Sequence, residues 1–388
     1  MLIEDSSVVE NALQPAECSA PYSVEIIQPI RDGWDMLVSA FADACLEQSA
    51  CYMGSRWSTS RLCGLVMRSA ASGEAEAIAL AVIASVPVLK AGLAYIKFGP
   101  LWNRRDKPKR PHVLRAALAA INEQFVAKRG LLVRIMPPPD PDATSNWGSE
   151  LAHAGYRGHG HIENPDRYLV DLSLSEKEQF ASLGPKWRAN LRKADPGLII
   201  RESDTAASLP VFMDLYAAMS ERKRFTDHHQ IQLLSELVRS APVGLRPRLF
   251  TANLHGRPVA ASLVVSAGER ADIPFSASGN EALPSRAGFA LRWAIINELR
   301  GSHNRWLDLG GDEGDAGLRH FKLGNVGSGG RVVPLAGEFD HSGTPLSSLV
   351  TSVLGLSQGV SRRAHGWAPT VASRMRLLRT ATTGSTGA

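Results

Sequence analysis

One short stretch of the 388-residue chain, LDLGGDEGDAGLRHFKLGN (307–325), gathers side chains suited to proton transfer and charge stabilisation. Its Lys322 follows Phe321, and an apolar neighbour favours partial desolvation of the ammonium group. A preorganised lysine charge can stabilise the negative charge that develops on an oxygen in a transition state. Lys322, with its neighbour Phe321, is therefore a catalytic candidate; the alternative is a solvated polar turn.

Aspartates in the same stretch are candidates for a general base. Asp308 ends an apolar segment typical of a buried strand, and ligands of open α/β sheets bind beyond the carboxyl ends of strands. We therefore take Asp308 as a catalytic candidate, while Asp312 and Asp315 stay open as bases. Asp312, Glu313 and Asp315 lack the ordered spacing of a calcium loop, and no His/Cys cluster has zinc spacing. We expect no metal.

A predicted helix in the segment GPKWRANLRKA is crowded with positive charge, because Lys186, Arg188 and Arg192 fall within about two turns. Like charges at this spacing cost a few tenths of a kcal/mol per pair. An anionic ligand would turn that cost into binding, since the planar arginine fork suits phosphate oxygens. The three residues are candidates for binding an acceptor phosphate; the alternative is a solvated basic face.

The segment SRAGFALRW opens a predicted helix through a loop of small residues. Free backbone N–H groups and the helix dipole make such an opening a site for anions such as pyrophosphate. Arg286 and Gly288 are therefore donor-binding candidates. Acyltransferases of the GNAT superfamily hold coenzyme A with a Gln/Arg-x-x-Gly-x-Gly/Ala loop that opens a helix. In this chain Ser285 occupies the position of the Gln or Arg that begins that motif. An ordinary helix start is the alternative.

Two segments of the chain share a strand–loop–helix–strand layout, and these segments must position the candidates above. The first runs from GLAYIKFGP to LLVRIMP, and the second from ADIPFSASGN to RWLDLGG. Apolar residues predict one buried face on each helix: Leu114, Leu118, Ile121 and Phe125 on the first, and Phe289, Trp293 and Ile296 on the second. A helix between two such strands is a right-handed crossover between parallel neighbours.

The order of the predicted elements is that of a duplicated GNAT fold. Two helices, three strands separated by turn signals, and the second strand–helix–strand unit follow one another in the second half. We predict an α/β (α+β) protein with two tandem GNAT-like domains, each a mixed sheet flanked by helices. The predicted ranges are a disordered N-terminus (1–21), an N-terminal domain (22–165), a catalytic C-terminal domain (166–340) and a basic, partly helical tail (341–388).

Composition indicates a soluble globular protein, with 44% hydrophobic and 21% charged residues. No apolar run approaches the roughly 20 residues that cross a bilayer. The first residues lack a signal-peptide pattern, and all four cysteines lie in the first 63 residues without a close pair. We therefore expect a cytoplasmic location. The formal charge of +5 lies in the five arginines of residues 341–388, so residues 1–340 are neutral.

The sequence resembles the Fem family, the aminoacyltransferases that build peptidoglycan cross-bridges, and related GNAT proteins described as BioF2-like or polysaccharide-biosynthesis acetyltransferases. The resemblance covers roughly residues 22–335. Five marks occur in the family's order: FGPLW, AHAGYR, YLVDLSLSEKEQFASL before WRANLRKA, LYAAMSERKRF, and WLDLGGDEGDAGLRHFKLG.

The resemblance implies twin GNAT-like domains with the acceptor in a cleft. The family's Phe-Lys pair corresponds to Phe321 and Lys322, and the arginine of its basic helix corresponds to Arg188, which in members that use nucleotide sugars meets acceptor phosphates. The family's motif usually continues toward Phe-Gly, whereas Asn325 and Val326 stand here. This departure keeps open a non-catalytic protein that binds an envelope precursor.

The leading interpretation is an N-acyltransferase that acts on an amine of a polysaccharide or peptidoglycan precursor. The donor is acyl-CoA or aminoacyl-tRNA, and the neutrality of residues 1–340 disfavours a large tRNA footprint. The alternative within the same class is a tRNA-dependent bridge aminoacyltransferase. The basic tail predicts contact with an anionic membrane face, with an unstructured tail as the alternative.

Overall fold

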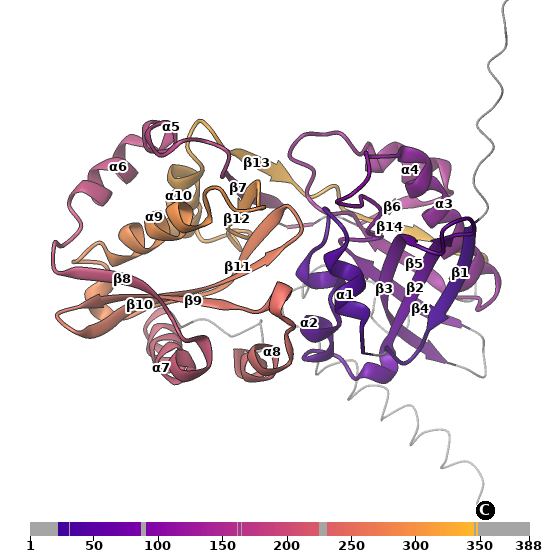
Figure 1. Cartoon of the computed structure of the whole chain (residues 1–388), viewed down its shortest axis with the longest axis horizontal. Coiled ribbons are helices and arrows are strands. Elements are labelled where there is room, and N and C mark those ends of the chain that lie inside the picture. The colour runs from indigo at the N-terminus through magenta and orange to yellow at the C-terminus, as the bar shows by residue number, and fades with distance from the viewer. Residues whose placement is uncertain are drawn as a thin grey trace, which may run out of the picture.

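The structure, a computed structural model, describes residues 22–344 and Ser347, apart from residues 31, 87–90, 161, 164 and 225–230. The predicted disordered N-terminus and nearly all of the predicted basic tail lie outside the described residues. Two seven-stranded sheets, each covered by helices, form the chain (Figure 1). Within the described part of the chain, no helix is long and apolar enough to cross a membrane.

The first sheet has the strand order β1-β2-β3-β4-β5-β14-β6. Only β4 and β5 run parallel among its named pairs. Its strands are β1 (Tyr22–Ile27), β2 (Leu62–Ser69), β3 (Ala75–Val86), β4 (Ala91–Lys97), β5 (Leu132–Met136), β6 (Arg157–His159) and β14 (Glu338–His341).

The second sheet has the strand order β13-β7-β12-β11-β10-β9-β8, and its parallel pair is β11 with β12. Its strands are β7 (Asp166–Asp171), β8 (Leu198–Ser203), β9 (Arg248–Leu254), β10 (Arg257–Ala267), β11 (Arg270–Ser278), β12 (Trp306–Asp308) and β13 (Arg331–Pro334).

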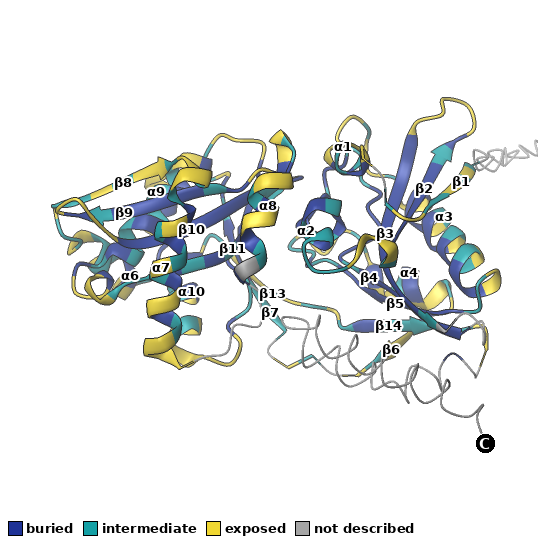
Figure 2. Cartoon of the chain, turned by 90° about the horizontal axis from the view of Figure 1, so that it is seen from below, coloured by how far each residue is buried: buried dark blue, intermediate teal, exposed yellow. Residues whose placement is uncertain are grey.

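Helices cover both faces of each sheet (Figures 1 and 2). The helices α3 and α4 bury their apolar residues against one face of the first sheet, and α9 does so against one face of the second. The α-helices are α1 (Trp34–Ser39), α2 (Ala50–Gly54), α3 (Pro111–Ile121), α4 (Trp147–His153), α5 (Glu176–Ser182), α6 (Pro185–Arg192), α7 (Thr205–Lys223), α8 (Leu234–Ser240), α9 (Ala287–Leu299) and α10 (Ala316–Val326).

Both predicted crossovers are present, as β4–α3–β5 and β11–α9–β12. The first helix buries all four predicted residues, including Leu114 and Phe125. The prediction for the second helix was only partly right. Ile296 is buried with Leu291 and Ile295, whereas Phe289 and Trp293 are half-buried because they pack against helices rather than the sheet.

The last described strand, β14, returns to the first sheet and pairs with both β5 and β6. The buried Arg134 fixes this return, because its guanidinium donates two hydrogen bonds of 2.7 Å to Asp340. The predicted boundary at residue 340 therefore falls inside a strand of the first sheet. The second sheet ends with β13.

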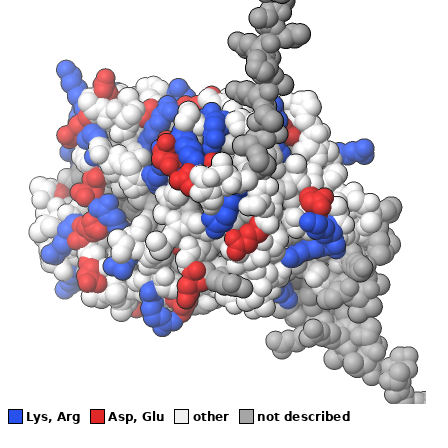
Figure 3. Space-filling model, turned by 45° about the vertical axis from the view of Figure 1, so that its right-hand side comes forward, with Lys and Arg blue, Asp and Glu red and all other residues white. Residues whose placement is uncertain are grey.

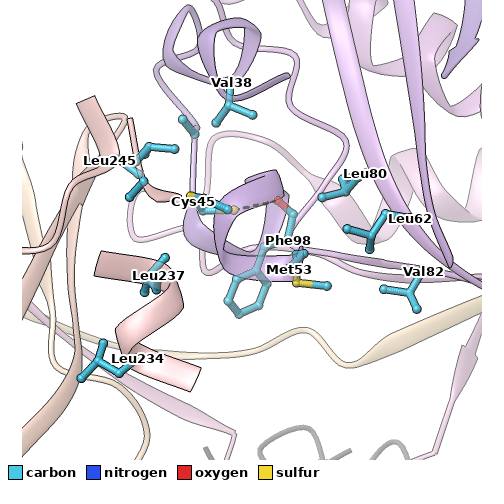
Figure 4. Close-up of a cluster of buried hydrophobic side chains, with 14 of the residues drawn as sticks. Val38, Cys45, Met53, Leu62, Leu80, Val82, Phe98, Leu234, Leu237 and Leu245 are labelled. Atoms are coloured by element: carbon cyan, nitrogen blue, oxygen red, sulfur yellow. Dashed lines mark hydrogen bonds between the residues drawn. The ribbon is translucent and has the colours of Figure 1, made fainter. Parts of the chain in front are cut away.

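A shared apolar core joins the two halves. Residues of α1, α2 and the first sheet cluster with residues of α7, α8 and the second sheet. Figure 4 shows Leu234, Leu237 and Leu245 of the second half facing Cys45 and Phe98 of the first. The backbone N–H of Glu269 also donates to the carbonyl of Ala42 at 2.7 Å. The two halves therefore form one packed unit rather than separate bodies on a linker.

Candidate active site

The second sheet opens where β11 and β12 separate. The two strands pair in parallel over only three residue pairs, and the last of them is Asp272 with Asp308. β11 continues for six residues beyond this pair. In the first sheet, the equivalent strands β4 and β5 stay paired to Lys97 and Met136, the last residue of each. The opening at the carboxyl end of β12 is the place where an open α/β sheet binds its ligand.

Lys322 lies beside this opening on helix α10. Asp315 starts the helix as its N-cap, with a side chain that accepts a hydrogen bond from the N–H of Leu318 at 2.8 Å. The Lys322 side chain is buried, and its Nζ donates to the carbonyl oxygen of Gly311 in the loop after β12. Burial, with the nearby Arg167 and Arg292 cations, lowers the pKa of Lys322 to about 7.

Phe321 faces a different way from its neighbour. Its ring contacts Trp187 and Phe289 at centroid distances of 5.9 and 5.2 Å, and those two rings lie 5.1 Å apart. This cluster packs α6, α9 and α10 together. Phe321 therefore fixes the helix that carries Lys322, while burial against the β12 loop desolvates the ammonium group.

Each aspartate predicted as a base has a structural partner. Asp308 is buried and accepts hydrogen bonds from Arg167 at 2.8 and 3.1 Å and from the N–H of Gly310 at 2.8 Å. Burial disfavours its charge, but the guanidinium groups of Arg167 and Arg270 outweigh burial and hold its pKa below the usual range. Such a carboxylate is a weak base, and it positions Arg167 and the β12 loop.

Asp312 and Asp315 are similarly engaged. Asp312 is buried and accepts from the hydroxyl of Tyr168 at 2.6 Å and from the N–H of Gly314 at 3.0 Å. These hydrogen bonds outweigh burial and lower the pKa of Asp312. Asp315 caps α10. Both residues therefore shape the loop and helix that present Lys322.

A buried cluster of charges that the sequence did not reveal lies at the same opening. Asp272 pairs with Arg270 at 3.3 Å and lies 4.0 Å from Arg167. Burial raises the pKa of Asp272 to about 6, against the opposing effect of Arg270. Asp272 lies two residues before Pro274 in a segment that reads as an ordinary strand. Only its pairing with Asp308 shows that it lies at the opening.

Arg292 is a second residue that the sequence did not single out. It projects from α9, and its Nη2 lies 3.4 Å from the hydroxyl of Ser276 on β11. Its Nε and Nη1 atoms are buried and have no hydrogen-bond partner in the described part of the chain. Burial lowers the pKa of Arg292 to about 10. Its charge helps to lower the pKa of Lys322.

The predicted basic helix is α6, and it lies directly against α10. The N–H of Gly184 donates to the carbonyl of Gly324 at 2.9 Å. Lys186 and Arg192 are exposed, whereas Arg188 is half-buried and donates through Nη1 to the carbonyls at the end of α5. Arg188 therefore has a structural role in addition to any ligand contact.

The predicted donor-binding residues open helix α9. Arg286 is its N-cap residue, with a positive φ of 60°, and its guanidinium donates to the carbonyl of Leu283 at 2.6 Å. Gly288 lies in the first turn, and a Cβ built on it would meet no atom within 4 Å. This helix start has open space beside it. Among the residues that the structure describes, no group of three potential metal ligands occurs.

Comparisons with known proteins place this opening in a recognised domain. Residues 186–323 match a family model described as "Acetyltransferase (GNAT) domain". The whole fold is similar to the crystal structure of FemX, with a TM-score of 0.67 and 16% identity over 85% of this chain and 99% of that one. It is also similar to a conserved protein of unknown function from Bacteroides thetaiotaomicron VPI-5482, with a TM-score of 0.52 and 12% identity over 81% and 99% of the chains. No curated protein matches the chain.

The matched segment begins in α6, contains the β11–β12 opening and ends one residue after Lys322. The predicted tandem α/β architecture and the predicted resemblance to Fem-type and related GNAT proteins are confirmed. Residues 186–323 are an acetyltransferase domain of the GNAT type, and the chain is an acyltransferase.

Proposed function

We propose that this acyltransferase moves an acyl or aminoacyl group onto an amine of a cell-envelope precursor, with Lys322 at the reacting centre. One observation carries the proposal: the buried Lys322 ammonium lies beside the opening between β11 and β12, inside the matched GNAT domain. The resemblance of the sequence motifs to the Fem family supports the envelope precursor as acceptor, and the likeness to FemX agrees with the fold that this resemblance implies.

The chemistry needs orientation and charge stabilisation more than covalent catalysis. An amine attacks the carbonyl carbon of the donor, and the carbonyl oxygen becomes an oxyanion. A charged group aimed at that oxygen in a water-poor site lowers the barrier, and loss of such a group typically costs about 10²–10³ in rate. Lys322 is suited to this role because the Gly311 carbonyl and the packing of α10 hold its ammonium group in place.

Acyl-coenzyme A is the donor that GNAT domains use, and we propose it here in preference to aminoacyl-tRNA. Lys and Arg are interspersed with Asp and Glu over the face shown in Figure 3. Residues 1–340 are neutral in formal charge. A large tRNA footprint gains its affinity from many phosphate contacts, and a mixed-sign surface provides few of them. Arg286 and Gly288 at the start of α9 are proposed to meet the donor's phosphates.

Thermal unfolding with different donors tests this assignment. Acetyl-coenzyme A at about 100 times its Kd should stabilise the protein by about 2.7 kcal/mol and raise its Tm. Arg286→Ala should reduce the shift, whereas the matched change Arg192→Ala on α6 should preserve it. Stabilisation by aminoacyl-tRNA but not by acetyl-coenzyme A would reverse the choice of donor.

The acceptor side is proposed from α6, which packs against the helix of Lys322. Lys186 and Arg192 are exposed there, and Arg188 uses only Nη1 in its hydrogen bonds to the backbone. These residues are proposed to meet phosphates of a nucleotide-linked or lipid-linked precursor. A cytoplasmic location at the inner membrane face is also proposed, because the five arginines of residues 341–388 would be attracted to its anionic lipids.

A further inference from the structure

Asp272 and Asp308 are the last residue pair before β11 and β12 separate, but their surroundings differ. The Asp308 carboxylate receives hydrogen bonds from Arg167 and Gly310, and its side chain is fully buried. The Oδ2 atom of Asp272 is also buried but has no hydrogen-bond partner within the described chain, and the side chain as a whole keeps 10% of its surface exposed. The open carboxylate of the pair is therefore Asp272.

The groups that face Asp272 come from both halves of the molecule. Arg270 lies on its own strand, Asp308 on β12 and Arg167 on β7. The electrostatic neighbours from the N-terminal half are Glu47, Tyr52 and Cys45. In this set three carboxylates face two arginines, and Lys97, which pairs with Glu47, balances the charges. Asp272 Oδ2 still has no hydrogen-bond partner within the described chain, so it is the atom that an incoming ammonium group can bind.

The N-terminal half closes one side of this cluster. The Phe98 ring lies under the guanidinium groups of Arg167 and Arg270, with centroid distances of 5.9 and 5.5 Å. Glu47 pairs with Lys97 at 3.4 Å next to that ring. Asp272 therefore lies beside side chains of the N-terminal half, and Arg167 is a charged neighbour of both Asp272 and Lys322.

Basicity separates Asp272 from the other candidates. Burial raises its pKa to about 6, whereas the pKa of Asp308 and of Asp312 is lowered. A base works best when its pKa lies near the operating pH. An amine arrives as an ammonium ion and must lose a proton before it can attack.

We propose that Asp272 binds the ammonium group of the acceptor and accepts its proton, an inference that rests on the proposed acyl transfer. One proton passes from the ammonium to the Asp272 carboxylate, and the free amine attacks the thioester carbon. The new N–C bond sends the carbonyl electron pair to oxygen, beside Lys322. Collapse breaks the C–S bond, the sulfur leaves with its electron pair and takes the second proton from nitrogen, and Asp272 returns its proton to solvent.

The test compares two amines in transfer from acetyl-coenzyme A. Ethanolamine is an ammonium ion at neutral pH, whereas hydroxylamine is largely unprotonated and needs no base to become a nucleophile. Asp272→Asn should slow transfer to ethanolamine about 100-fold, in the usual range for loss of a general base, and transfer to hydroxylamine by less than about 3-fold. The control Asp340→Asn removes a carboxylate that is paired with Arg134 in the first sheet, and both rates should be preserved.

Equal effects of Asp272→Asn on the two amines, or no effect on either, would overturn the proposal. A carboxyl titration followed by carbon-13 NMR decides the case if that variant misfolds: in the native protein, a resonance with a midpoint near pH 6 is expected for Asp272, and a midpoint below about 4 would contradict a base. A native protein that acylates neither amine, yet shows the expected titration, refutes the proposed acyl transfer to simple amines and not the site.

Discussion

At the scale of the residue, the burial of Lys322 disfavours the positive charge of its ammonium group. The unfolded chain binds a proton at this lysine up to about its ordinary pKa of 10.5, whereas in the folded protein the pKa is about 7. Between these values the unfolded state binds more protons, so this group makes folding more favourable as pH rises. Below pH 7, folding must bury the charged form of Lys322, and this lowers the free energy of unfolding.

Replacement of Lys322 by methionine should therefore stabilise the protein at low pH. The expected gain at pH 6 is about 2–4 kcal/mol, because each unit of pKa shift corresponds to about 1.4 kcal/mol and the lost hydrogen bond to Gly311 offsets part of it. The gain should shrink as pH approaches 10. Denaturant unfolding at both pH values measures it. A Lys322→Met variant that is less stable than the native protein at pH 6 would show that the lysine is held for stability.

Lys322 was proposed as catalytic from its sequence setting, but its surroundings were not predicted. The Phe321-Lys322 pair suggested an apolar neighbour for the ammonium, and the structure turns Phe321 away into the ring cluster with Trp187. Asp272 was missed because a single aspartate in a strand carries no local signal. Its place at the opening depends on its pairing with Asp308 on β12, which is more than thirty residues away in the sequence.

At the scale of the element, helix α10 was the main omission. Its sequence contains Gly317 and Gly324, and glycine costs about 1 kcal/mol in a helix interior, so the stretch resembled a loop. Packing explains Gly324: a Cβ there would lie 3.0 Å from Trp187 Cδ1, so glycine lets α6 approach. The long periodic helices α3 and α7 and the hairpin strands β9 and β10 were predictable because their patterns are local.

The N-cap of α10 should matter for activity more than its stability effect implies. Asp315→Ala removes the hydrogen bond to Leu318 and should cost about 1 kcal/mol. Asp204→Ala removes the equivalent cap of α7, with its hydrogen bond to Ala207, and should cost a similar amount. Only the first change loosens the helix that holds Lys322, so only the first should lower the transfer rate. Equal transfer rates for the two variants would contradict the role assigned to α10.

At the scale of the whole molecule, the two halves share one core, and the charged cluster at the opening draws on both. Gly268 shows how close they come: its φ is +58°, and a Cβ would lie 2.3 Å from the carbonyl oxygen of Ala42. The sequence predicted the duplicated layout, since strand and helix periods are local. It could not predict that only the second parallel pair opens, because that difference depends on pairing across the sheet.

The position of the strand β14 is also decided by contacts across the whole molecule. The chain returns to the first sheet after the second is complete, and Arg134 and Tyr95 hold that strand through Asp340 and Glu338. Nothing in the sequence of residues 338–341 indicates which of the two sheets the segment joins. Its position after the second half of the chain therefore suggested the second sheet. Predicted boundaries taken from order along the chain therefore placed it in the wrong sheet.

The central claim is that this chain transfers acyl groups at the β11–β12 opening, with the Lys322 ammonium beside the developing oxyanion. The most direct measurement is the rate of amide formation from acetyl-coenzyme A and a primary amine by the native protein and by Lys322→Met, followed by mass spectrometry. The native protein should form the amide, and the variant should be about 10²–10³ times slower while remaining folded. Equal rates for the two proteins would contradict the claim.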